Sequence, residues 1–159
     1  WYYEMELLGY NYRMNEMQAA LGISQLKKLN SFISRRRQIV NIYNNELSLI
    51  ENIIVPFEED NVNSNFHIYV IQILENKYFD RYDMYYYLIE MGYAPMIHYI
   101  PIHLLKFYKE TFNYKIGDFP NCEKYYQRCI SLPLFPSMSD DEVYNVIEVI
   151  KKFVKSKLS

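Results

Sequence analysis

Apolar residues recur at helical spacing near the start of the chain. Asn15 followed by Gln18 has the form of a capping box, which indicates that a helix begins there. Asn30 is a suitable cap for a second helix. Ile33, Val40 and Leu47 lie seven residues apart and so fall on one stripe of that helix. Phe32, Ile39 and Tyr43 support this stripe.

Short runs of β-branched and aromatic residues predict a small sheet after these helices. Residues 53–55 are expected to form a buried strand that Pro56 stops. Residues 66–74 are a stronger candidate because they carry almost no charge, and both faces are apolar enough to be covered. A third strand is expected at residues 94–98, where Pro95 favours a place at the sheet edge.

Helical patterns return in the second half of the chain. Residues 80–91 carry tyrosines at helical spacing. Pro120 is well placed to begin another helix, which is expected to reach about residue 130. Residues 131–135 are expected to be extended. Ser139 with Glu142 forms a second capping box, which predicts a final amphipathic helix.

This order of elements predicts an α+β domain behind a pair of connector helices. We expect the connector helices and a dimer-contact segment at residues 1–47. A small domain should follow at residues 48–159, with a short sheet covered by helices on one side. The 159 residues are enough for one domain with a real core. Residues 99–119 show no regular pattern.

Composition excludes several classes of protein. Half of the residues are hydrophobic and 18% are aromatic, so disorder is not expected over most of the chain. A formal net charge of −2 gives no electrostatic reason to expect a nucleic acid partner. No apolar stretch approaches the ~20 residues that cross a bilayer. A cytoplasmic protein without a membrane partner is therefore expected.

The two cysteines, Cys122 and Cys129, fall in one predicted helix. At helical rise they would lie roughly 10 Å apart, beyond the ~7 Å limit for a disulfide. We expect them to be small buried residues in a reducing compartment.

An amide and a guanidinium stand just ahead of the first helix, at Asn11 and Arg13. Two positions apart on an extended segment, they can point the same way and hold an anion, and the planar fork of arginine suits a phosphate. The alternative is that Arg13 pairs with a nearby carboxylate while Asn11 shapes a turn. On the residues alone, both interpretations remain open.

Two imidazoles frame the segment H-Y-I-P-I-H at residues 98–103, and its loop position predicts exposure to a cleft. Zinc would need three or four ligands, and the local sequence offers no third histidine, near cysteine or well-placed carboxylate. No metal site is therefore expected. His67 lies inside an apolar strand, where a histidine satisfied within the core is the expected role.

Three consecutive arginines, Arg35, Arg36 and Arg37, fall within the second predicted helix. They span most of a helical turn, so they cannot all face one ligand. A solvated face and an ion pair between subunits are expected here.

The run G-Y-N-Y-R-M-N-E-M-Q-A-A-L-G at residues 9–22 resembles the segment that enters the small domain of the DegT/DnrJ/StrS sugar-nucleotide aminotransferases. The runs at residues 117–124 and 132–136 complete the resemblance, and both are interpreted as structural. The family has the fold of fold-type I (aspartate aminotransferase-like) enzymes and uses pyridoxal 5'-phosphate (PLP). The chain opens at Trp1, inside the family's pattern. The resemblance therefore implies a C-terminal portion, with PLP bound mainly by an N-terminal domain that carries the Schiff-base lysine.

The resemblance also implies roles for the candidate site residues. Asn11 and Arg13 would reach phosphates of cofactor or substrate in a neighbouring subunit, which makes a homodimer part of the mechanism. His98, Tyr99 and His103 would meet the sugar and diphosphate of a nucleotide-linked ligand. No catalytic residue is expected within this chain.

The implied reaction moves an amino group from glutamate to C4 of a UDP-linked 4-keto-6-deoxy-N-acetylamino sugar, in surface-polysaccharide or pseudaminic acid biosynthesis. The run M-I-H-Y-I-P-I-H at residues 96–103 is particularly close to that branch. Alone, the fragment should be inactive. Two alternatives stay open: a sugar dehydratase of the same family, with histidine in place of the lysine, and a non-catalytic truncated module that dimerises with a full-length paralogue.

Overall fold

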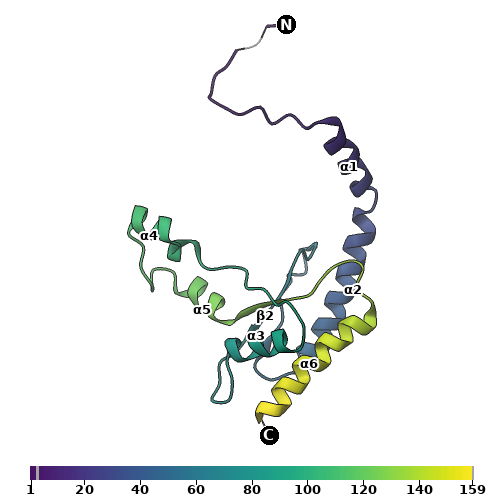
Figure 1. Cartoon of the computed structure of the whole chain (residues 1–159), viewed down its shortest axis with the longest axis vertical. Coiled ribbons are helices and arrows are strands. Elements are labelled where there is room, and N and C mark those ends of the chain that lie inside the picture. The colour runs from purple at the N-terminus through teal and green to yellow at the C-terminus, as the bar shows by residue number, and fades with distance from the viewer. Residues whose placement is uncertain (3, 159) are drawn as a thin grey trace.

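An extended arm, the first helix and the beginning of the second helix project from the rest of the chain in the computed structural model, which describes residues 1–2 and 4–158 (Figure 1). Helix α1 (Glu16–Leu26) begins at Asn15, and the predicted capping box is confirmed: Asn15 Oδ1 accepts from the backbone N–H of Gln18, whose side chain accepts in return. The predicted cap at Asn30 is wrong, because α2 (Leu29–Leu47) begins one residue earlier. Lys27 and Lys28 both keep right-handed helical backbone angles, so the chain enters α2 without a capped break.

Three short antiparallel strands form the sheet, in the order β1-β2-β3. They are β1 (Ile53–Ile54), β2 (Tyr69–Ile73) and β3 (Cys129–Leu132). The central strand is shorter than predicted, since Phe66 has a φ of +43° and does not continue the extended chain. The strand predicted at residues 94–98 is reduced to one bridge, Met96 with Ser131, at the sheet edge.

The core lies between one face of this sheet and the helices α2, α3 (Arg81–Glu90) and α6 (Asp140–Leu158). Alternate side chains of β2 point into it, namely those of Tyr69, Ile71 and Ile73. Helix α3 buries Arg81, Met84 and Leu88, whereas its tyrosines 82 and 86 are exposed. The α+β class is confirmed. The expectation that both faces of β2 are covered is wrong, because Val70 and Gln72 on the other face are only half-buried and line an open groove.

Helix α2 contributes four residues to this core, from Ile39 to Leu47. Tyr43 stacks on Tyr69 with ring centroids 4.9 Å apart, and Glu46 on α2 pairs with Lys151 on α6. The C-terminal half of α2 is thus packed on the sheet and the helices α3 and α6, which together we call the body. The domain boundary at residue 47 stays a prediction.

The arginine run lies on α2, and two of its members form ion pairs within the chain, while the expected ion pair between subunits stays a prediction. Arg35 donates to Met138 O and Asp140, and Arg37 forms a bidentate pair with Glu58. The Nε atom of Arg36 between them is buried and has no hydrogen-bond partner among the described residues.

A projection unforeseen in the sequence occupies residues 99–119. It contains the short 3-10 helix η1 (Ile102–Leu104) and helix α4 (Lys106–Phe112), and it returns to the body through α5 (Pro120–Arg128), as Figure 1 shows. Because α5 ends at Arg128, Cys129 lies in β3 and is buried while Cys122 is exposed. The expectation of two buried cysteines on one helix was therefore wrong, although both are free thiols.

Candidate functional site

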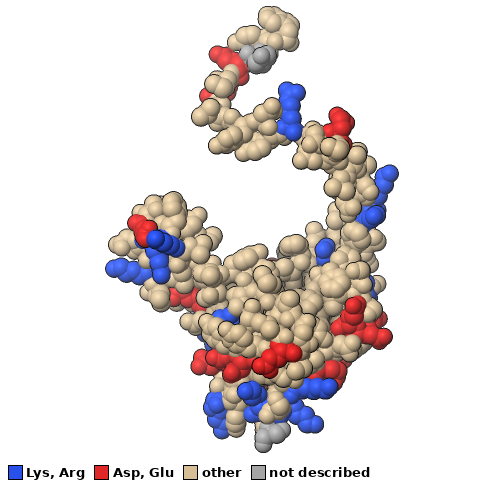
Figure 2. Space-filling model, in the orientation of Figure 1, with Lys and Arg blue, Asp and Glu red and all other residues tan. Residues whose placement is uncertain are grey.

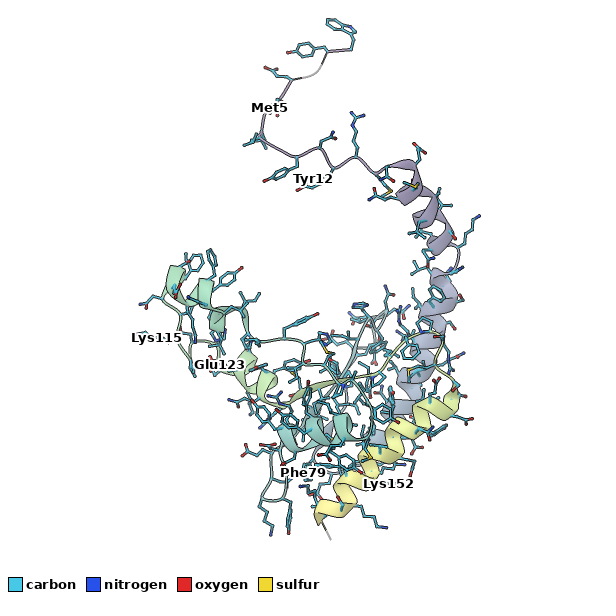
Figure 3. The ribbon with its side chains drawn as sticks, in the orientation of Figure 1. Met5, Tyr12, Phe79, Lys115, Glu123 and Lys152 are labelled. Carbon is cyan, nitrogen blue, oxygen red and sulfur yellow. The ribbon has the colours of Figure 1, made fainter. Side chains whose placement is uncertain are left out.

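The arm that carries Asn11 and Arg13 packs against nothing in this chain. Every described residue from 1 to 14 is exposed, and neither Asn11 nor Arg13 makes a hydrogen bond or ion pair within the described residues. Figure 3 shows Met5 and Tyr12 pointing into open space. The local carboxylate partner that would explain Arg13 is not there, so both side chains remain available for an anion.

The arm and α1 also expose an unusual amount of apolar surface. Large apolar side chains stand out along both, and Figure 2 shows few charged atoms among them. They are Trp1, Tyr2, Met5, Leu7, Leu8, Tyr10, Tyr12, Met14, Met17, Leu21, Ile23 and Leu26. No residue of α1 is buried. A contiguous exposed apolar surface of this kind is typical of a protein–protein interface.

His98 lies against the strand β3, on the sheet face opposite the core. Its Nδ1 atom is 2.6 Å from Ser131 Oγ. Burial raises the pKa of the Cys129 thiol in the same strand. His98 is held to β3 through its ring.

A cavity of about 370 Å³ adjoins His98, a size that suits a small ligand. Ser131 and His67 also line it. His67 is exposed, so the prediction of a histidine satisfied within the core is wrong: residue 67 precedes β2 and does not point into the core. Tyr99 is 72% exposed, and its ring meets that of His98 edge-on.

His103 is separated from this cavity. It is only 6% exposed, and its Nε2 atom lies 2.9 Å from Glu123 Oε1. The hydrogen bond from His103 lowers the pKa of Glu123, and the backbone N–H of Gly117 that donates to the same carboxylate lowers it further. The ring also packs on Phe119 and lines a different hollow of about 440 Å³ on the projection. His103 thus borders a hollow, but it is nearly buried and holds the projection together.

The described residues hold no group of three or more His, Cys, Asp or Glu side chains close enough to bind a metal ion. None of the lysines is buried, and all except the half-buried Lys151 are exposed. In the part of the chain that the structure describes, we find no helix with the length and apolar character to span a bilayer.

Two residues of these sites were not singled out as functional from the sequence. The sequence pattern places Ser131 in an extended segment and Glu123 in a run interpreted as structural. A small polar residue within an otherwise apolar strand is the signal that could have marked Ser131. Nothing local in the sequence connects Glu123 to His103.

Comparison with known proteins gives a consistent result along the whole chain. A model of the DegT/DnrJ/EryC1/StrS aminotransferase family matches residues 1–151. The spore coat polysaccharide biosynthesis protein SpsC of Bacillus subtilis is 43% identical over 157 residues, covering 98% of this chain and 40% of SpsC. The UDP-4-amino-4,6-dideoxy-N-acetyl-beta-L-altrosamine transaminase of Campylobacter jejuni is 29% identical over 161 residues, covering 96% of this chain and 42% of that enzyme.

Among solved structures, the PLP form of Spr1654 from Streptococcus pneumoniae superimposes with a TM-score of 0.87 at 28% identity, covering 100% of this chain and 40% of that one. The chain therefore spans about 40% of the length of the curated relatives that it matches.

Proposed function

The chain belongs to the DegT/DnrJ/EryC1/StrS aminotransferase family, and from this premise we propose that it supplies the small domain and a partner-binding arm to a sugar-nucleotide aminotransferase. The proposal is supported by the coverage of its relatives and by an arm whose apolar side chains have no cover in this chain. Members of the family use PLP, which when bound accepts the amino group from the donor and passes it to the acceptor.

Asn11 and Arg13 are the residues of this chain proposed to hold PLP, through its phosphate. Their donor groups fit that role: one side-chain amide and one guanidinium, both exposed and without a partner among residues 1–2 and 4–158. This free pair on a projecting arm is the observation that carries the proposal. Because the arm leads away from its own body, the phosphate is proposed to belong to a second copy, in a homodimer with shared sites (Figure 1).

His98 and Tyr99 are proposed to contact the nucleotide-sugar substrate. His98 lines a cavity, and Tyr99 beside it is exposed and therefore accessible to a ligand. His103 was grouped with them on the sequence. Its pairing with Glu123 supports a more indirect role, in which it fixes the loop that carries the other two.

The acceptor is proposed to be C4 of a UDP-linked 4-keto-6-deoxy-N-acetylamino sugar, with glutamate as amino donor. The name of the Campylobacter jejuni relative supports this substrate class, and the name of SpsC supports a place in surface-polysaccharide biosynthesis. A cytoplasmic location follows for an enzyme that uses soluble nucleotide sugars.

The shared phosphate site is tested by cofactor retention in a complete enzyme that carries this chain as its C-terminal part. Asn11→Ala and Arg13→Ala should each lower the PLP content after dialysis, since each removes a phosphate donor. His67→Gln is the matched control, because His67 is exposed and lies elsewhere. Equal PLP retention in the three variants would remove the proposal.

We also propose that this chain does not hold the cofactor through a lysine of its own, and the 159-residue chain itself provides the test. After incubation with PLP and reduction with borohydride, mass spectrometry should find no single lysine modified in preference to the others, because none is buried. A stoichiometric adduct at one lysine would show that the chain holds the cofactor by itself.

The exposed arm also favours one alternative, a non-catalytic module that binds a full-length paralogue. The coding sequence upstream of Trp1 separates the two proposals. An in-frame cofactor domain supports the enzyme, whereas a start codon next to Trp1 supports the module.

A further inference from the structure

We infer that Ser131 is a positioning residue that fixes the ring of His98 and leaves Nε2 as the nitrogen available to a ligand. The inference rests on the proposed function in one respect, the ligand role of His98. The fixing of the ring stands on the contacts of this chain alone.

Ser131 is itself held firmly. It lies within β3, where it pairs with Val70 of the central strand, and it is only 5% exposed. Its backbone N–H donates to Met96 O at 2.7 Å, and its carbonyl accepts from Met96 N–H at 3.3 Å. The hydroxyl therefore belongs to a residue that is hydrogen-bonded within the sheet. Met96, which is bridged to Ser131, lies two positions before His98.

Pairing of β3 with β2 places the side chain of Ser131 on the same face of the sheet as the ring of His98. Ile130 and Leu132 pair with Ile71 and Tyr69, which point into the core, so Ser131 between them points to the opposite face. His98 meets it there, with Nδ1 2.6 Å from Oγ. The ring has two nitrogens, and this contact occupies one of them.

A hydroxyl is suited to this task because it can donate or accept a hydrogen bond. It can accept from a protonated Nδ1 and, after rotation, donate to an unprotonated one. The ring therefore keeps one orientation in either charge state. Glu123 beside His103 differs, because an ionised carboxylate only accepts. His98 and His103 are thus held by different kinds of partner. Of these two, only His98, which contacts the hydroxyl of Ser131, lines the cavity with His67.

The test is ring dynamics by NMR in the 159-residue chain, which has three histidines, so that His67→Gln and His98→Gln assign the signals. In the wild-type chain the ring of His98 should be as ordered as the β3 backbone, with an order parameter of about 0.85, whereas the exposed ring of His67 should be mobile. Ser131→Ala should lower the order parameter of His98 to below about 0.6. Ser131→Thr, which keeps the hydroxyl, should preserve it, and so should the control Ser137→Ala on an exposed turn.

Equal mobility of His98 and His67 in the wild-type chain would overturn the inference without any variant, even if Ser131→Ala fails to fold. An ordered ring in folded Ser131→Ala would also overturn it. Titration with UDP separates the inference from the proposed function. A shift of the His98 Nε2 signal supports the ligand role, whereas ring loosening in Ser131→Ala with no effect of UDP on His98 keeps the positioning role and contradicts the ligand role.

Discussion

Nε2 of His103 lies 2.9 Å from Oε1 of Glu123, and this buried contact joins η1 to α5. The same carboxylate accepts from the backbone N–H of Gly117 at 2.8 Å. Both ends of the projection at residues 99–119 therefore meet at a single side chain. Figure 3 shows Glu123 at the base of the projection, with Lys115 farther out.

Glu123 should make the unfolding free energy of the chain depend on pH in the acid range. The pKa of Glu123 is lowered from 4.5, chiefly by the hydrogen bond from His103. The ionised carboxylate therefore stabilises the folded chain fully above about pH 4.5, and this stabilisation is lost as the pH falls through the lower pKa of the folded state. Glu123→Gln should destabilise the chain at pH 7 and flatten the fall in stability between neutral and acid pH. Urea unfolding at several pH values measures this.

The control for this prediction is Glu75→Gln, at an exposed glutamate, which should keep the acid dependence of the wild-type chain. The carboxylates Glu58 and Glu142 also have lowered pKa values, so some acid dependence should persist in Glu123→Gln. An acid dependence identical in Glu123→Gln and the wild-type chain would contradict the role of the pair.

Ile71 should be among the most sensitive core positions. It is fully buried in the central strand, so Ile71→Ala should cost about 2–5 kcal/mol of unfolding free energy through lost burial and a cavity. Ile68→Ala, at a residue 37% exposed on the other side of the sheet, should cost less than about 1 kcal/mol. Chemical denaturation compares them, and similar losses would mean that the two faces are equally packed.

Replacing Arg36 should stabilise this chain. Its Nε atom is buried without a hydrogen-bond partner, so Arg36→Met should raise the unfolding free energy by about 1 kcal/mol by removing an unsatisfied donor while keeping the apolar stem. Arg37→Met should destabilise, since it breaks the pair with Glu58. Thermal unfolding shows whether each variant is more or less stable than the wild-type chain. A loss of stability in Arg36→Met would show that this guanidinium has a partner in solution.

The arm and α1 should be dispensable for the stability of the body. A variant that begins at Lys28 should unfold within about 0.5 kcal/mol of the complete chain, because no residue of α1 is buried. Calorimetry measures this, and hydrogen exchange should be fast along α1 in the complete chain. A clear drop in melting temperature would show that the arm folds back on the body.

Local chemistry made part of this fold predictable from sequence. Both capping boxes, at Asn15 and Ser139, have the predicted bonds, because they depend only on residues three positions apart. The central strand β2 was likewise predictable, because it contains a run of β-branched and aromatic residues. The family resemblance was also confirmed, since it depends on motifs spread over the whole length.

The errors arise where distant residues decide the structure. The local pattern predicts a helix at Cys129, but pairing with Gln72 places this residue in a strand. The pattern also predicts that the strand includes His67, because a hydrophobicity pattern does not reveal the positive φ of Phe66. The contacts of His98 with Ser131 and of His103 with Glu123 span 33 and 20 positions, and no spacing rule connects residues so far apart.

The place of residues 104–116 outside the sheet also bears on how such a chain can diversify. A surface segment that takes no part in strand pairing can change length and composition without disturbing the sheet. Grafting residues 104–116 from a relative should thus yield a folded chimera, so this segment is a natural place at which to exchange sequence between family members.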